Sequence, residues 1–155
     1  MKKDVKQKLI IEQLDRKLDQ YKPLLKISIP DKGWIHTIRK AYKMSFRQFG
    51  NLLKITPPSA EAIEKREQDK SITLKSLEEA GRVLNMKFVY GFIPMDGSVE
   101  KSIENKAKEK AIEIVQMTSE NMVLEDQKNS EKRLSKAISE KTTELIDEMP
   151  RYLWD

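Results

Sequence analysis

Apolar residues recur at spacings of three and four along most of this chain, which is the pattern of amphipathic α-helices. In residues 3–20 the apolar positions are Val5, Leu9, Ile10, Leu14 and Leu18. Pro23 ends this pattern because proline is not compatible with a helix interior. We therefore expect one N-terminal helix, followed by a short extended connection over residues 24–30.

Four more helices are expected between residues 31 and 95, at 33–42, 45–54, 57–67 and 73–84. Ser45, with Gln48 three residues later, has the form of a capping box, in which each side chain bonds the backbone N–H of the other. Gly50 stands in the middle of a helix, where glycine costs up to about 1 kcal/mol relative to alanine. It therefore predicts a close backbone approach, with the next helix as the candidate. The expected buried residues of this region include Phe46, Phe49, Leu52, Leu53, Ala60 and Ile63.

The break between helices 45–54 and 57–67 is the most informative local feature. Thr56 can cap the second helix, and Pro57 and Pro58 are tolerated in a first turn because the amide groups there have no partner within the helix. The connection through Ile55 is short. The break therefore allows two short helices to cross at a steep angle.

The composition changes at residues 87–94, which read Lys-Phe-Val-Tyr-Gly-Phe-Ile-Pro. Aromatic and β-branched residues ahead of a proline are typical of a strand. A single strand has unpaired edges, so pairing with its copy in a second subunit would form a two-fold dimer. A lone extended segment that covers the core is the alternative.

Helical spacing returns over residues 99–124 and 130–149, before Pro150. These stretches contain few bulky apolar residues, so we expect them to pack on another part of the protein. The chain ends with Tyr152, Leu153 and Trp154 ahead of Asp155. These side chains either fold back on their own domain or act as an anchor in a groove of a partner.

Composition agrees with an all-α fold that has a modest core. Of 155 residues, 38% are hydrophobic and 35% charged, so solvated helix faces make up much of the surface. Five glycines and six prolines are too few for an all-β protein with many tight turns. We divide the chain into an N-terminal helical arm (1–30), a central domain (31–95) and a C-terminal helical extension (96–155).

The residue types present argue against an enzyme. The absence of cysteine excludes a thiol nucleophile and a thiolate metal site. His36 is the only histidine, so a metal site with several histidine ligands cannot form. There is no glycine-rich phosphate loop. The longest apolar stretch is far shorter than the roughly 20 residues that span a bilayer. We expect a non-enzymatic cytoplasmic protein without metal, cofactor or membrane contact.

Charge is distributed unevenly along the chain. Residues 1–95 carry twenty Lys and Arg against eleven Asp and Glu, a net +9, whereas residues 96–155 carry ten against fourteen, a net −4. A basic region attracts a polyanion because each neutralised phosphate releases counterions. Ordinary solvation of helix surfaces is the alternative explanation.

The central motifs together resemble the Cro/repressor-like helix-turn-helix fold and, more narrowly, the family called mobile mystery protein A. The motifs are Gly33-Trp-Ile-His-Thr-Ile-Arg-Lys-Ala41, Met44-Ser-Phe-Arg-Gln-Phe-Gly50, Thr56-Pro-Pro-Ser59, Ile63-Glu-Lys-Arg-Glu67, Ile72-Thr-Leu-Lys-Ser-Leu77, Phe88-Val-Tyr90 and the terminal Leu-Trp-Asp. Members of that family are typically encoded beside a Fic-domain protein. The resemblance therefore implies an antitoxin or regulator paired with a Fic-type toxin.

The resemblance also implies that helix 45–54 lies across the DNA backbone and that helix 57–67 enters the major groove. The residues expected at phosphates are Arg47, Gln48, Lys54, Thr56 and Lys70. Those expected at base edges are Ser59, Glu61 and Ala62, with Lys65 and Arg66 nearer the rim. Pro57 and the acidic Glu61 depart from the usual pattern, so base readout is expected to be weak in each half-site and to require a dimer.

Two functions are compatible with these features. The first is a sequence-specific transcriptional repressor that binds double-stranded DNA as a homodimer and regulates its own operon with a Fic-type toxin. The basic first part of the chain favours this function. The second is an antitoxin that neutralises the Fic-type enzyme by direct contact without reading DNA. Pro57 and Glu61 favour the second, although the Ser/Thr-x-x-x-Glu-Gly/Asn inhibitory motif usual in Fic antitoxins is absent.

Overall fold

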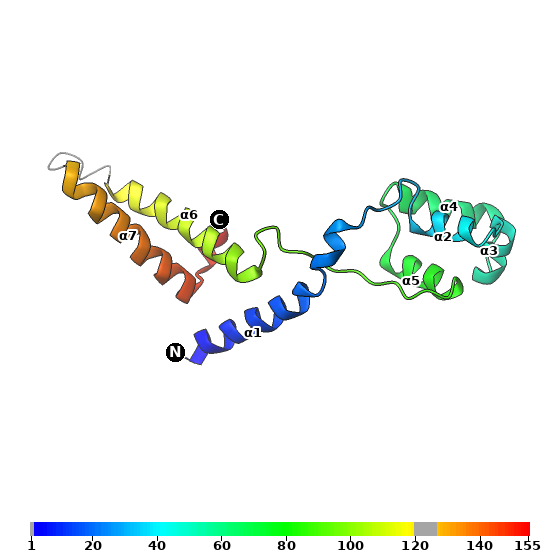
Figure 1. The fold of residues 1–155 in the computed structure, drawn as a ribbon, viewed down its shortest axis with the longest axis horizontal. Helices are drawn as coiled ribbons and strands as arrows, with labels where there is room; N and C mark the ends of the chain where they lie inside the picture. The colour runs from blue at the N-terminus through cyan, green and yellow to red at the C-terminus, as the bar shows by residue number, and fades with distance from the viewer. Residues whose placement is uncertain (1, 120–126) are drawn as a thin grey trace. The chain divides into compact units, whose positions relative to one another are not determined.

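A computed structural model describes residues 2–119 and 127–155, and all regular structure within these ranges is helical (Figure 1). This confirms the all-α class. The internal contacts form two compact units, one of residues 24–91 and one of residues 1–23 with 92–155. The first residues of the chain thus belong with the last ones, an association that the sequence did not indicate. None of the described helices combines the length and the hydropathy that a membrane span needs.

The unit of residues 24–91 is built from four short helices, α2 to α5. Their bounds are Trp34–Ala41 for α2, Phe46–Leu53 for α3, Pro57–Gln68 for α4 and Leu74–Val83 for α5. A 3-10 helix, η1 (Lys22–Lys26), contains the boundary at which this unit begins. Helix α4 contacts both α2 and α3, and α3 also contacts α5. Their shared core consists of Ile35, Phe49, Ala60, Ala80 and Leu84.

Local capping signals explain where these helices begin. The Ser45 hydroxyl accepts from Gln48 N, and the Gln48 side chain accepts from Ser45 N, so the expected capping box is present. Thr56 caps α4 through a bond from Ser59 N. Thr73 caps α5 in the same way. Each cap satisfies an amide that has no partner within the helix.

The other unit is built around two long helices, α6 (Val99–Ser119) and α7 (Gln127–Glu148), which run side by side (Figure 1). Its buried cluster is Ala107, Ala111, Leu145 and Leu153. Two alanines on α6 let the helix axes approach closely. These helices pack on each other and on Leu153 of the C-terminal 3-10 helix, and α6 also contacts the N-terminal helix, in agreement with the expectation that they pack on another part of the protein. Residues 120–124 of the predicted helix lie outside the described residues.

Helix α1 (Lys2–Asp19) belongs to the same unit and contacts α6. Its Asp15 carboxylate accepts from Val99 N at 2.7 Å and from Glu100 N at 3.2 Å, which caps the start of α6. Carboxylates are favourable at this end because the helix dipole is positive there. Ser98 Oγ also accepts from Lys101 N at 3.0 Å, so a local cap and a side chain from another helix together satisfy the start of α6.

The structure differs from three expectations about buried or paired segments. Residues 87–94 form no strand within the described single chain, and none of them is among the residues that pack on the core of α2 to α5. Their pairing with a second copy stays a prediction. Leu52 is exposed because α3 turns its Phe49 side to the core. The stripe expected on α1 is not buried as a whole: Val5 is 70% exposed.

Candidate nucleic-acid interface

The connection between α3 and α4 is held by a close backbone contact. Lys54 ends α3 with φ 60° and ψ 41°, in the left-handed region. A Cβ placed on Gly50 would lie 2.8 Å from the carbonyl oxygen of Ile55 and 3.3 Å from the carbonyl carbon of Thr56. The predicted close approach at Gly50 is confirmed, and its partner is the short connection that leads into α4.

Replacement of Gly50 by valine is expected to lower the free energy of unfolding of this unit by about 2 kcal/mol, because the branched side chain must push the Ile55 carbonyl away. Urea denaturation followed by circular dichroism measures this change. Asn51→Val is the matched control, since Asn51 is exposed on the same helix. Equal stability of the two variants would contradict the close contact.

A buried ion pair joins α2 to α4. Arg39 and Glu64 are only 4% and 3% exposed. Arg39 Nε donates to Glu64 Oε1, and its Nη2 donates to Oε2 at 3.3 Å. Its Nη1 donates to the Met44 carbonyl at 2.7 Å, and the guanidinium carbon lies 4.0 Å from the ring centroid of Phe46. The pair thus has the additional hydrogen bonds that a buried charge requires.

A second carboxylate of α4 caps α2. Glu67 accepts from Trp34 N at 2.8 Å and from Ile35 N at 2.9 Å, where the dipole of α2 favours a negative charge. His36 Nδ1 also lies 3.0 Å from Glu64 Oε2. The inner side of α4 therefore packs on α2 through the Arg39–Glu64 ion pair and the Glu67 cap. These contacts fix the orientation of α4 relative to α2.

The pattern of residues 33–42, with Trp34, Ile35 and Ile38 on one face, predicts that Arg39 lies on the polar face, and this prediction is wrong because Arg39 is buried. A usable signal was present: Arg39 follows the buried Ile35 by four residues, so the two share one helix face. A charged residue at such a position indicates a buried partner. The identity of that partner, Glu64, required the three-dimensional structure.

The outer side of α4 carries the residues expected at DNA. Ala60 and Glu64 are buried and mark the inner side, and the helical period places Glu61, Ala62 and Lys65 on the opposite side. The expected contact residues that are exposed are Arg47, Gln48, Lys54, Thr56, Ser59, Glu61, Lys65, Arg66 and Lys70. Ala62 is half-buried. These side chains come from α3, the connection, α4 and the turn that follows.

Several of these groups already have partners within the chain. Gln48 Oε1 accepts from Ser45 N at 2.8 Å, which leaves its amide hydrogens as donors. The Thr56 hydroxyl accepts from Ser59 N at 3.2 Å and donates to Ser59 Oγ at 2.8 Å, so its expected donation to a phosphate would compete with the cap. Lys65 Nζ lies 4.0 Å from Glu61 Oε1. The charge of Glu61 is therefore partly balanced.

The turn after α4 is held by Asp69. Its carboxylate accepts from the hydroxyl and from the backbone N–H of Ser71. These two bonds, with a further contribution from nearby Arg66, lower the pKa of Asp69 below its ordinary value. The bonds hold the backbone around Lys70, which has φ 64°.

The C-terminal residues Tyr152, Leu153 and Trp154 differ in burial. Leu153 is fully buried in the core of its own unit, so self-packing describes this residue and leaves it inaccessible to a partner. Tyr152 and Trp154 are exposed. Of the three residues expected to bind a partner, only these two present accessible side chains.

In the part of the chain that the structure describes, no group of three or more His, Asp or Glu could hold a metal ion. Comparison with models of protein families gave no match, and neither curated proteins nor solved structures gave a significant one.

Proposed function

We propose that residues 24–91 form a Cro/repressor-like helix-turn-helix domain that binds double-stranded DNA, and that the protein is a transcriptional repressor. The observation that carries this proposal is the two-sided character of α4. Its inner side is tied to α2 by the buried Arg39–Glu64 pair, while its outer side is exposed and bears Lys65. A helix held rigidly on one side and open on the other fits a major groove.

The charge of this unit supports the proposal. Residues 24–91 carry thirteen Lys and Arg against seven Asp and Glu, a net +6. Two of these cations, Arg47 in the first turn of α3 and Lys54 at the end of α3, are exposed. In this arrangement they bind phosphates on either side of the groove, while Ser59 faces base edges and Lys65 lies nearer the rim.

The proposal extends to a homodimer and to an operon shared with a Fic-type toxin gene, for which the protein acts as antitoxin or regulator. The resemblance described above supports this part. A two-fold dimer would place two copies of α4 on successive half-sites and compensate for weak readout in each. The cytoplasm is the expected location.

Direct neutralisation of a Fic-type enzyme without DNA binding is the second candidate. The observation that favours it is the position of Glu61, which is exposed on the side of α4 that would face phosphates. The engagement of the Thr56 hydroxyl in its cap points the same way. Purification with the neighbouring gene product, in the absence of DNA, tests this candidate.

Fluorescence anisotropy with the upstream region of the gene tests the first candidate, in the presence of competitor DNA and over a range of salt concentrations. Arg47→Ala with Lys54→Ala is expected to weaken binding to all sequences alike. The slope of log K against log[salt] should fall by about 2, one for each lost phosphate contact.

The matched control is Lys75→Ala with Arg82→Ala, which removes the same charge from exposed positions of α5. A similar loss in both double variants would show that net charge, and not the α3–α4 surface, determines binding. Binding of the native protein that competitor DNA abolishes would contradict a sequence-specific repressor.

A further inference from the structure

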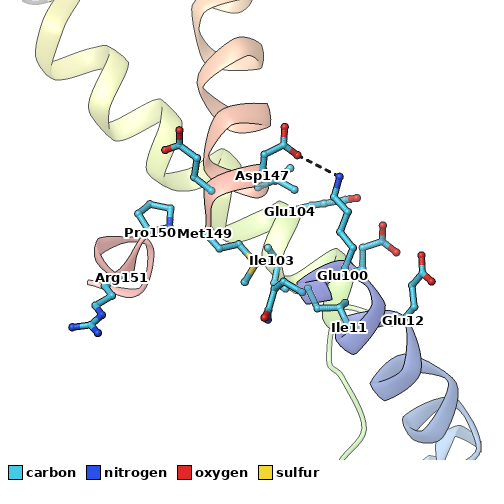
Figure 2. Close-up of a pocket in the computed structure, with 13 residues that line it drawn as sticks. Ile11, Glu12, Glu100, Ile103, Glu104, Asp147, Met149, Pro150 and Arg151 are labelled. Carbon is cyan, nitrogen blue, oxygen red and sulfur yellow. Dashed lines mark ion pairs between the residues drawn. The ribbon is translucent and has the colours of Figure 1, made fainter. Parts of the chain in front are cut away.

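A groove of about 560 Å³ lies between α1, the first turns of α6 and the end of α7 (Figure 2). All its lining residues belong to one compact unit. Its apolar lining consists of Ile11, Ile103, Ile146, Met149 and Pro150. A groove of this size accommodates several large side chains. It is separate from the surface proposed to bind DNA.

The edge of the groove is acidic. Its carboxylates are Glu12, Glu100, Glu104, Asp147 and Glu148, against two cations, Lys8 and Arg151. Lys8 Nζ lies 3.7 Å from Asp147 Oδ1, whereas Arg151 points away from these carboxylates in Figure 2. Within the described residues, neither Glu12 nor Glu100 forms an ion pair. The groove therefore suits an occupant with apolar side chains and positive charges.

The exposed side of α1 combines apolar side chains with positive charges. Val5 and Leu9 are exposed, and the helical period turns them, with Arg16, away from Ile11 on the apolar floor of the groove, while Glu12 at the groove edge borders this exposed side. Lys6 and Arg16 are exposed and form no ion pair in the described part of the chain. Because one side of α1 is already a wall of the groove, its opposite side cannot enter that same groove.

We propose that the groove receives the exposed side of α1 from a second copy of the chain. Two copies would exchange this contact reciprocally, as a two-fold interface requires. Val5 and Leu9 would then be buried on the apolar floor, and Lys6 and Arg16 would meet the acidic edge. This inference deepens the homodimer of the proposed function and places its interface at α1 instead of residues 87–94. It does not depend on DNA binding.

A charge exchange tests the interface in the full chain. Variant A is Glu100→Lys with Glu148→Lys, which makes the groove basic without changing α1. Variant B is Lys6→Glu with Arg16→Glu, which makes the entering side of α1 acidic. Each variant alone places like charges together at both contacts, and a mixture of A and B restores opposite charges at both. Both variants keep a positive net charge, because the native chain carries +5 and variant B loses four.

Sedimentation velocity is expected to show a native dimer, with a dissociation constant at least about tenfold higher for A alone and for B alone. The mixture should recover most of the native affinity. A matched control, Glu109→Lys with Glu113→Lys, changes charge equally on α6 outside the groove and should leave the dimer intact.

Three outcomes would overturn the proposal. The native chain could be monomeric at every concentration, the mixture of A and B could fail to recover dimer, or Val89→Asp with Tyr90→Asp could dissociate the dimer while A and B do not. Circular dichroism of each variant identifies any loss of helix. Because these measurements use protein without DNA, their failure is distinguishable from a failure of DNA binding.

Discussion

Replacement of Arg39 by alanine is expected to lower the free energy of unfolding of the unit of residues 24–91 by about 3–5 kcal/mol. The change leaves the Glu64 carboxylate buried at 3% exposure without its partner. It also removes the donor to the Met44 carbonyl and the contact with Phe46. Most small domains are stable by only about 5–15 kcal/mol, so this unit should lose a large share of its stability.

Urea denaturation followed by Trp34 fluorescence measures the effect, in a Trp154→Phe background so that the signal comes from this unit alone. The control is Arg39→Met together with Glu64→Leu. Apolar replacement of both partners avoids an isolated buried charge and should recover most of the stability. A loss below about 1 kcal/mol for Arg39→Ala would contradict the role of the pair. DNA affinity should fall with the folded fraction.

Replacement of Leu153 by alanine is expected to lower the free energy of unfolding of the other unit by about 2–4 kcal/mol. Leu153 is fully buried beside Ala107, Ala111 and Leu145, and two of these neighbours are too small to fill the cavity that remains. Thermal unfolding monitored by circular dichroism should show a lower midpoint for the α6–α7 transition.

Tyr152→Ala provides the control, because Tyr152 is next in sequence but exposed. Its effect should stay within about 0.5 kcal/mol, as for most surface substitutions. If Leu153→Ala leaves the stability unchanged, the C-terminus does not pack on its own unit, and an anchoring role in a partner becomes the better explanation for Leu153.

Features that depend on residues close in sequence were predictable. The starts of α3 and α4 follow from Ser45 with Gln48 and from Thr56, because a cap acts over three residues of chain. The close contact at Gly50 was also predictable, since a glycine within a helix is unfavourable unless space is required. Local rules suffice where the partners are neighbours along the chain.

Features that depend on distant partners were not predictable. Asp15 caps α6 from a position 84 residues earlier. Glu67 caps α2 from a later helix, at a separation of 33 residues. Leu52 and Val5 are apolar at helical spacing and yet exposed, because spacing indicates a face but not whether another element covers it. The strand expected at residues 87–94 is absent from the described single chain for the same reason, since a strand needs a partner.

For the proposed DNA surface, the sequence alone determined which residues belong to α4. It determined the positive net charge of the first part of the chain as well. It also determined the all-α class, because helical periodicity and capping are recorded within a few residues of each position. Only the tertiary structure decided which side of α4 is buried, because that choice depends on Arg39, 25 residues away, meeting Glu64. Ion pairs between residues far apart in the sequence depend on how the helices pack, so the spacing of residues along the chain does not predict them.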